Sequence, residues 1–312
     1  MAVPTITFSN GKAIPAVGLG VWRAEKDVLA STIAAAIDAG YRHFDCAADY
    51  GNEAEVGAAL AGAIESGRVT REELFITTKL WNSDHGHVAE ALEQSLKNLR
   101  LTYVDLYLVH FPIATKHTGI GVGGIEKDGN GVMILDTSVS LEQTWRHMEA
   151  AVDAGKARSI GVSNYDVFLV RDLLSYARIP PATNQIETHP YFQRDSLVRL
   201  CLAHGIAVTA HTPLGGGQAN ADLFGSASPL DDPAILELAR KYNKTPAQIV
   251  LRWGLERQTI VIPKSTKPDR IKENIDSVDF SLTPEDMARI KKIDRNKRSN
   301  DPQGAWGIDI YA

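Results

Sequence analysis

The chain has 312 residues, of which 44% are hydrophobic and 23% charged, with a formal net charge of -5 at pH 7. These ordinary values and the lack of a basic cluster argue against a nucleic-acid partner, but they allow anionic small molecules. Because no run approaches the ~18 apolar residues of a membrane span and residues 1–9 do not resemble a signal peptide, we expect a cytoplasmic protein with no membrane partner.

The chain begins with a hairpin pattern and then alternates between strand and helix patterns. Asn10-Gly11 lies between the strand-like runs Thr5–Phe8 and Ala13–Ile14, which is typical of a two-residue hairpin. Apolar runs predict strands at 17–20, 43–46, 74–80, 104–110, 159–163, 184–187, 207–211 and 260–262. Apolar stripes predict helices within 28–37, 52–64, 88–99, 141–152, 167–176, 197–201, 234–242, 246–257, 268–275 and 284–293.

Two long loops and a tail interrupt this alternation. Residues 112–139 carry glycines at positions 119, 121, 123, 124, 129 and 131, which leave little chance of regular structure. The pattern of these glycines does not sit between strand and helix as that of a phosphate-binding glycine loop does, so we predict a mobile active-site loop. A second long loop is expected at 212–232. The tail 294–312 is expected to be irregular, with Trp306 as an apolar anchor over the site.

Eight parallel strands alternating with helices in about 300 residues predict a (β/α)₈ TIM barrel that forms one domain, 1–312. The N-terminal hairpin, the two loops and the tail would be added to it, with the tail over the barrel mouth. A doubly wound sheet is the alternative. That fold usually carries Gly-x-Gly-x-x-Gly after its first strand, and Gly18-Leu19-Gly20-Val21-Trp22-Arg23 lacks the third glycine.

Polar residues stand at the carboxyl ends of the predicted strands, which meet at one mouth in a barrel. They are Asp45 and Tyr50, Lys79, His110, Ser163 and Asn164, Gln185, His211, and Lys264 and Ser265. A lysine that closes the apolar run 74–78 is costly to bury unless an anion pairs with it, and Asp45 is available.

A Lys79–Asp45 pair beside Tyr50 predicts proton transfer by the phenol. The ammonium would favour the phenolate. It would bring the pKa of the phenol, ordinarily ~10, toward a range in which the phenol can donate and recover a proton. His110 would hydrogen-bond a carbonyl oxygen. Each residue alone also has a structural explanation, as a rim cation, a core hydrogen-bonder or part of a helix cap, with Asn52 able to cap the next helix. Their convergence favours catalysis.

The cysteines point to no metal chemistry. Only Cys46 and Cys201 occur, both in apolar segments, so we predict two buried thiols in a reducing compartment and no metal site.

The chain resembles the aldo-keto reductase family over essentially its whole length. The segments that carry the resemblance are Gly18–Trp22, Asp45–Glu53, Lys79–Asn82, Leu106–His110, Gly161–Asn164, Asn184–Gln185 and Ile262–Ser265. The resemblance implies a catalytic tetrad of Asp45, Tyr50, Lys79 and His110. Tyr50 would be the general acid while hydride moves from a nicotinamide to an aldehyde carbon.

The resemblance also implies a nicotinamide cofactor that extends across the mouth without a Rossmann domain. Ser163, Asn164 and Gln185 would hold the carboxamide. The adenosine end would meet Lys264, Ser265, Thr266, Arg270, Glu273 and Asn274, whose cations suit a 2′-phosphate and favour NADPH over NADH. The alternative for this run is the basic first turn of a solvated helix. Further cofactor contacts are expected at Gly20, Trp22, Asp45, His211, Thr212 and Leu214.

His211 departs from most of the family, which stacks a tyrosine on the nicotinamide. A histidine can stack, but it can also protonate near pH 6.5, which would disfavour a positively charged oxidised nicotinamide.

Three segments, 187–197, 211–216 and 306–312, narrow the resemblance to the plant-type aldose-6-phosphate reductases. In that subgroup the residue after the catalytic tyrosine is typically basic and helps to hold the sugar phosphate. Here it is Gly51, and Lys116, His117 or Arg298 could supply the missing cation.

We therefore expect NADPH-dependent reduction of an aldose or aldose 6-phosphate. A broad aldehyde reductase and a non-enzymatic NADPH-binding regulatory subunit are the alternatives. Besides Tyr50, His110, Lys116 and Arg298, the substrate would meet a rim of Trp22, Trp81, Phe111 and Trp306, for which core packing is the other explanation. The protein would be a monomer or a weak homodimer.

Overall fold

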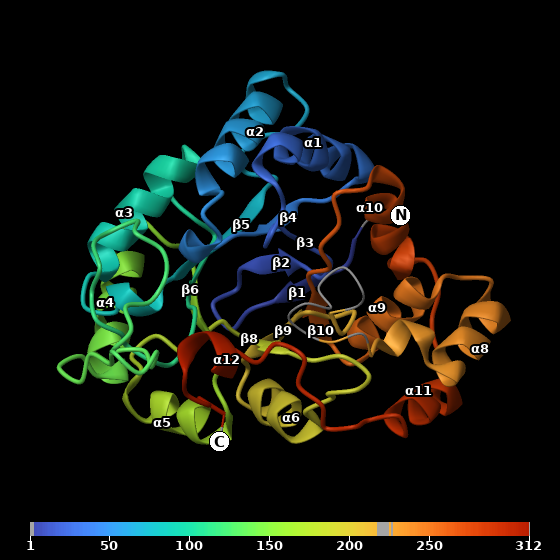
Figure 1. The fold of residues 1–312 in the computed structure, drawn as a ribbon. Helices are drawn as coiled ribbons and strands as arrows, with labels where there is room; N and C mark the ends of the chain where they lie inside the picture. Colours follow the sequence, from blue (N-terminus) through green and yellow to red (C-terminus); the bar gives the residue numbers. More distant parts are fainter. Residues whose placement is uncertain (1–2, 217–224, 226, 312) are drawn as a thin grey trace.

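The computed structural model describes residues 3–216, 225 and 227–311, and its centre is a ring of parallel strands inside a ring of helices (Figure 1). Eight strands form one sheet in the order β10-β9-β8-β7-β6-β5-β4-β3. Their bounds are β3 Leu19–Gly20, β4 His43–Asp45, β5 Phe75–Leu80, β6 Leu106–Val109, β7 Ile160–Ser163, β8 Thr183–Glu187, β9 Ala207–His211 and β10 Thr259–Val261.

The segment before β3 joins the two ends of this sheet. The N–H of Gly18 donates to Val261 O at 2.9 Å, and the N–H of Val261 donates to Ala16 O at 2.9 Å. Val17 forms a parallel bridge with Val261. The predicted barrel is therefore confirmed, and its closure leaves no exposed edge between β3 and β10.

The helices cover the outside of the strands with their apolar faces. In α3, for example, the predicted stripe of Val88, Leu92, Leu96 and Leu99 is buried. The helix bounds are α1 Leu29–Ala39, α2 Glu53–Glu65, α3 Val88–Leu99, α4 Leu141–Asp153, α5 Val167–Tyr176, α6 Asp195–Ala203, α8 Pro233–Tyr242, α9 Pro246–Glu256, α10 Pro268–Ile275, α11 Pro284–Lys291 and α12 Gln303–Trp306.

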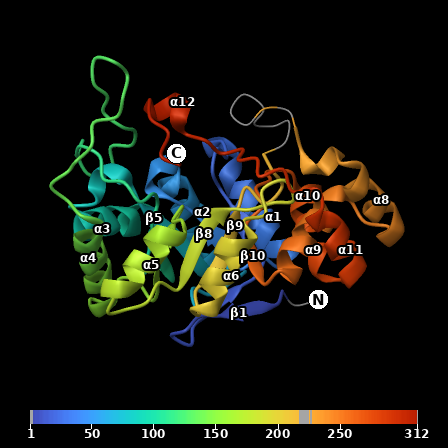
Figure 2. The ribbon, with the colours of Figure 1, turned by 90° about the horizontal axis from the view of Figure 1, so that it is seen from below.

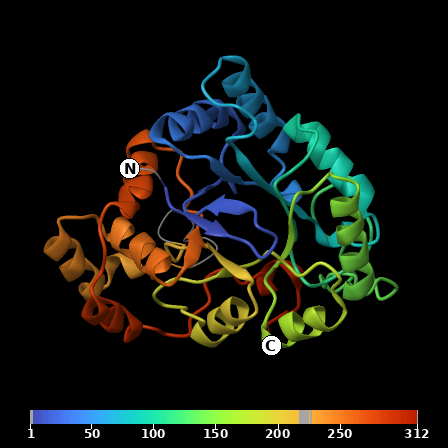
Figure 3. The same ribbon diagram turned by 180° about the vertical axis from the view of Figure 1, so that it is seen from behind.

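The predicted N-terminal hairpin closes one end of the barrel (Figure 3, blue). Its strands β1, Thr5–Thr7, and β2, Ala13–Pro15, pair antiparallel with Ile6 opposite Ile14. Phe8 and Ile14 pack against Phe75 and other residues at the amino ends of the barrel strands. The hairpin therefore forms a floor, and the other end is left for chemistry.

The long loop and the tail lie at that other end, on the side of the molecule opposite β1 (Figure 2). Residues 112–139 form an irregular loop in which Thr115 makes an antiparallel bridge with Leu135, and Lys127 with Met133. The loop is therefore more ordered than its glycine content predicts. Its mobility stays a prediction. The expectation of a wholly irregular tail is wrong, because 303–306 form the short helix α12. Most of the loop 212–232 lies outside the described residues.

The cap predicted for α2 is also wrong. Asn52 occupies the N-cap position but makes no side-chain capping bond. Its amide donates instead to Val21 O at 3.0 Å, which ties the start of α2 to the loop after β3. Both cysteines are free and buried, as predicted. Within the described ranges, none of the helices combines the length and apolar character that a membrane crossing requires.

Two glycines of α2 test how tightly the helix layer is packed. A Cβ on Gly57 would lie 2.3 Å from the backbone oxygen of Asn98, whereas a Cβ on Gly62 would meet nothing within 4 Å. We expect Gly57→Ala to lower the free energy of unfolding by about 1–3 kcal/mol. Gly62→Ala should raise it by about 0.5–1 kcal/mol, because alanine suits a helix better than glycine. Urea denaturation of both variants checks this, and equal shifts would contradict it.

Candidate active site

The strand ends bring the predicted polar residues to one buried centre. Asp45 ends β4, Lys79 lies in β5, and His110 directly follows β6. Tyr50 ends the 3-10 turn that follows β4. Asp45 and Lys79 are each 1% exposed and His110 is 8% exposed, so charges at this centre act with little screening by water.

The Lys79 ammonium is held by three oxygen acceptors, which match its three N–H groups. Its Nζ lies 2.5 Å from Asp45 Oδ1, 2.9 Å from Cys46 O and 3.0 Å from Tyr50 Oη. The predicted Lys79–Asp45 pair beside Tyr50 is therefore present. Burial by itself would lower the pKa of Lys79, but Asp45 and Tyr50 raise it above its ordinary value.

The Lys79 ammonium favours the Tyr50 phenolate, as expected, but it does not bring the pKa of the phenol below its ordinary value in the free protein. Burial is the largest influence and raises the pKa of Tyr50 to about 12, while the Lys79 ammonium acts in the opposite direction. Tyr50 is consequently a protonated donor at neutral pH. The adjacent ammonium is positioned to stabilise the phenolate once the proton has left.

The second oxygen of Asp45 extends the network to the predicted carboxamide residues. Gln185 Nε2 donates to Asp45 Oδ2 at 2.6 Å, and the Ser163 hydroxyl donates to Gln185 O at 2.8 Å. Asn164 Nδ2 in turn donates to Ser163 Oγ at 3.1 Å. Three strand ends, those of β4, β7 and β8, are joined in this way.

His110 is a neutral imidazole in this site. Burial lowers its pKa well below 6.5, and the charge of Lys79 acts in the same direction. Its ring lies edge-on to Tyr50, with centroids 5.8 Å apart, and to Trp81, with centroids 5.2 Å apart. A neutral ring beside the phenol can donate a hydrogen bond to a carbonyl oxygen without competing for the transferred proton.

His211 is neutral too, which corrects the expectation that it titrates near pH 6.5. Burial lowers its pKa to about 3, and Lys79, Arg298 and Arg194 act in the same direction against Glu187. Its Nε2 lies 3.1 Å from Asn164 Oδ1, so the ring is part of the same polar network.

Three of the four predicted rim aromatics form one cluster at the mouth. The Trp306 ring lies 4.7 Å from Phe111 and 6.2 Å from Trp81, between centroids. Trp81 also donates from Nε1 to Gly124 O at 2.7 Å, which fixes the long loop over the site. All three rings are less than 9% exposed, so they pack together as well as bordering the mouth. Trp22 lies apart from this cluster, with Arg23 5.8 Å from its ring.

The predicted adenosine end contains a cationic region. Partial burial is the largest influence that lowers the pKa of Lys264; the nearby Arg23 acts in the same direction and Glu25 in the opposite one. Ser265 Oγ accepts from the N–H of Lys267 at 3.1 Å, immediately before α10 begins. The cap residue Lys267 makes no side-chain capping bond, so the start of α10 suits an anion. Thr266 lies between these residues, and Arg270 is exposed in the first turn.

The remaining predicted cofactor residues have structural contacts as well. Glu273 accepts from the hydroxyl of Thr245, which docks α10 on α9, and Asn274 is buried in α10. A Cβ on Gly20 would lie 3.1 Å from Ile262 O, so β3 approaches the end of β10 closely. Thr212 has a left-handed φ of 51°, and Leu214 packs on the core.

Each candidate replacement for the cation missing at Gly51 already faces a carboxylate. Lys116 Nζ lies 2.6 Å from Glu126 Oε1, and His117 Nδ1 lies 3.2 Å from Asp84 Oδ1. Arg298 Nη1 lies 3.9 Å from Glu187 Oε2. None of these contacts joins Lys116 or His117 to the tetrad.

Two residues outside the predicted set also shape the site. Glu187, at the end of β8, is fully buried and accepts the backbone N–H groups of Ser299 at 2.7 Å and Asn300 at 3.0 Å. Tyr311 donates to Asn164 Oδ1 at 3.2 Å. The sequence signal for Glu187 was a carboxylate at a strand end, and nothing local indicated Tyr311.

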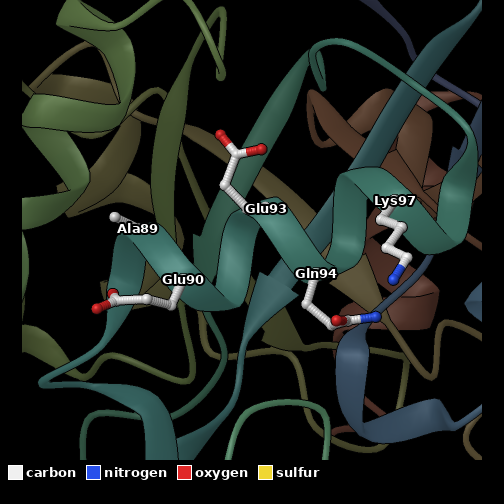
Figure 4. Close-up of a pocket in the computed structure, with 5 residues that line it drawn as sticks. All are labelled: Ala89, Glu90, Glu93, Gln94 and Lys97. Atoms are coloured by element: carbon white, nitrogen blue, oxygen red, sulfur yellow. The ribbon is translucent and has the colours of Figure 1, made fainter.

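A surface depression outside the barrel mouth offers no second candidate site. The depression in Figure 4 is lined by Ala89, Glu90, Glu93, Gln94 and Lys97, all from the outer helix α3, so no second element converges on it. Within the described residues, no group of three histidine, cysteine or acidic side chains is arranged to bind a metal.

Comparisons with known proteins agree with this geometry. The Aldo/keto reductase family profile matches residues 16–295. An NADP-dependent D-sorbitol-6-phosphate dehydrogenase of Malus domestica is 56% identical, over 99% of both chains. The aldose reductase of Schistosoma japonicum has a TM-score of 0.90 at 41% identity, covering 99% of this chain and 98% of its own. A Bombyx mori aldo-keto reductase in complex with NADP has a TM-score of 0.88 at 42% identity, covering 97% of each chain.

The low pKa of His211 predicts that its ring does not titrate near neutral pH. Since the unfolded chain binds this proton near pH 6.5, the contribution of His211 to stability is present above pH 6.5 and is lost as the pH falls toward about 3. NMR of the histidine rings, with His211→Gln to assign the resonance, should show no midpoint above about pH 5 for this residue. A midpoint close to 6.5 would contradict the burial argument.

Proposed function

The chain belongs to the aldo-keto reductase family, and from this premise we propose that it uses NADPH to reduce the aldehyde of an aldose or aldose 6-phosphate to the alditol. The observation that carries the proposal is the buried ammonium of Lys79, in contact with both Asp45 and the Tyr50 hydroxyl. Such an arrangement has no evident structural purpose, because a well-packed apolar group would fill the same space at lower cost.

The residues at the mouth fit a nicotinamide dinucleotide with a 2′-phosphate. Ser163, Asn164 and Gln185 carry the amide and hydroxyl groups that a carboxamide needs. Lys264 lies in the loop before α10 and Arg270 in the first turn of α10, and both could pair with the phosphate. The start of α10, whose cap residue makes no side-chain capping bond, supports this assignment, since its backbone N–H groups attract an anion. The cofactor named for the Malus domestica relative, NADP, is the one that these cations suit.

In the proposed reaction, this chain's residues place the carbonyl and supply one proton. The neutral His110 donates a hydrogen bond to the carbonyl oxygen, and Tyr50 transfers its hydroxyl proton to the same oxygen. The reduced nicotinamide supplies the hydride that forms the new C–H bond. Hydride and proton together convert the aldehyde into a primary alcohol, and Lys79 stabilises the Tyr50 phenolate that remains.

One comparison supports a sugar phosphate as the substrate, and one residue argues against it. The Malus domestica relative, at 56% identity, is named for sorbitol 6-phosphate. Gly51, in contrast, offers no cation beside Tyr50. The buried cluster of Trp81, Phe111 and Trp306 favours the second candidate, a broad aldehyde reductase, because an apolar rim suits apolar aldehydes.

Tyr50→Phe tests the general acid. We expect kcat with NADPH to fall by about 100-fold or more for every aldehyde, because phenylalanine keeps the ring but has no proton to transfer. Steady-state kinetics with glucose 6-phosphate, mannose 6-phosphate, glucose, xylose and glyceraldehyde measure the loss, and tryptophan fluorescence confirms that the variant is folded. Retained turnover would contradict the role of Tyr50 as the general acid.

The same panel of substrates, measured on the wild-type protein, separates an aldose or aldose 6-phosphate reductase from a broad aldehyde reductase.

Gly51→Lys tests the phosphate. Gly51 has a left-handed φ of 64°, and a Cβ there would meet nothing within 4 Å, so a longer side chain has room at the cost of some backbone strain. We expect KM for glucose 6-phosphate to fall by about tenfold, through a charge-assisted hydrogen bond to the phosphate. The neutral control Gly51→Gln carries the same strain, and KM for glucose should change little in either variant. An equal effect of Gly51→Lys on both sugars would refute a phosphate next to Tyr50.

A further inference from the structure

We propose that Tyr311 is a positioning residue that couples closure of the C-terminal tail to binding of the nicotinamide carboxamide, by orienting Asn164. This inference rests on the proposed function for the identity of the cofactor. Its structural basis is the hydrogen bond from the Tyr311 hydroxyl to Asn164 Oδ1, which joins residues 147 positions apart in sequence.

The orientation of the Asn164 amide follows from its partners. One amide atom lies 2.9 Å from the backbone oxygen of His110, which can only accept a hydrogen bond, so this atom is Nδ2. The other atom is then Oδ1, and both groups facing it must donate. Burial raises the pKa of Tyr311 to about 12, so its hydroxyl is protonated and able to donate.

The same logic sets the tautomer of His211. Its Nε2 must carry the proton, because it lies 3.1 Å from Asn164 Oδ1, and its Nδ1 then accepts from the Thr212 hydroxyl at 3.1 Å. Asn164 Oδ1 is therefore held by two donors, Tyr311 and His211. This fixes the amide so that the two N–H groups of Nδ2 donate to His110 O and to the Ser163 hydroxyl, beside the residues proposed to meet the carboxamide.

Asn164 is a residue that needs such support. Its φ of 65° lies in the left-handed region, where asparagine is tolerated at some cost, and its side chain is buried at 5% exposure. Through Ser163 and Gln185 it is joined by hydrogen bonds to Asp45, and so to Lys79 and Tyr50. A change in the orientation of the Asn164 amide would therefore alter the hydrogen bonds that lead to Asp45, Lys79 and Tyr50.

The tail that carries Tyr311 is docked at several points over the mouth. Glu187 accepts the N–H groups of Ser299 and Asn300 at 2.7 and 3.0 Å. The Arg298 guanidinium lies 3.4 Å from the centroid of the Tyr311 ring and 4.8 Å from that of Phe192. This stacking holds the ring at a point from which its hydroxyl reaches Asn164.

The tail also meets the long loop at α12. The N–H of Met133 donates to Trp306 O at 2.9 Å, and a Cβ on Gly307 would lie 2.6 Å from Gly131 O. Closing the tail thus places Trp306 against Trp81 and Phe111 and brings Tyr311 to Asn164 in one step. In the closed state the tail therefore covers the substrate site and, at the same time, orients Asn164 for the carboxamide.

Coupling of this kind is reciprocal. If a closed tail favours the cofactor by preparing Asn164, a bound cofactor must favour the closed tail by the same factor. The tail should then be better protected in the presence of NADPH than in its absence.

Tyr311→Phe tests the coupling, because it keeps the ring stacked on Arg298 and removes only the donor. We expect the Kd for NADPH, from quenching of tryptophan fluorescence, to rise about fivefold, as for the loss of one hydrogen bond. In hydrogen exchange, NADPH should protect residues 299–311 in the wild type and protect them less in the variant. The control Tyr176→Phe, on the outer helix α5, should keep the wild-type values in both measurements.

The outcomes separate this inference from the proposed function. A wild-type protein that does not bind NADPH would reject the proposed function. A wild type that binds NADPH, with a Tyr311→Phe Kd equal to its own, would overturn the role of Tyr311 alone. Tighter binding by the variant would also overturn it, because the tail would then be competing with the cofactor for Asn164.

Discussion

The buried ammonium of Lys79 is the constraint on which the rest of the structure depends. A cation that is 1% exposed is tolerated only where oxygen atoms replace its hydration, and three of them surround this one. Two of the three come from β4 and the residue that follows it. In the parallel pairing of β4 with β5, Asp45 lies opposite Thr77, and Lys79 is two residues further along on the same face. A register slip by one residue would turn Lys79 away from its anion.

Burial and this pair together set the electrostatic state of the mouth. Burial lowers the pKa of His110 and His211, and the Lys79 cation acts in the same direction; on Tyr50 the cation opposes the effect of burial. At neutral pH the site therefore holds a protonated phenol, two neutral imidazoles and one ion pair. This state suits donation of a proton to a carbonyl oxygen, because the Tyr50 phenol carries the proton and the two imidazoles do not compete for it.

The two ends of the barrel are closed in different ways. The floor is a short hairpin whose Phe8 and Ile14 pack on the amino ends of the strands. The roof consists of the long loop and the tail, which meet at Met133 and Trp306 and are anchored to the barrel by Glu187. The floor is held mainly by apolar packing, with a hydrogen bond from Asn10 to Ser159. The roof is held by individual hydrogen bonds and stacked rings.

The sequence by itself determined the barrel, the hairpin and the residues at the strand ends, because strand and helix periodicities are local and parallel strands must present their carboxyl ends together. It also determined the pairing of Lys79 with Asp45, since a lysine within an apolar strand requires an anion. Only the tertiary structure decided the pKa directions of Tyr50 and His211, because burial depends on every segment that covers them. It alone showed that Asn52 binds the loop after β3 instead of capping α2, and that Tyr311 reaches Asn164, because such contacts join residues whose separation no local pattern encodes.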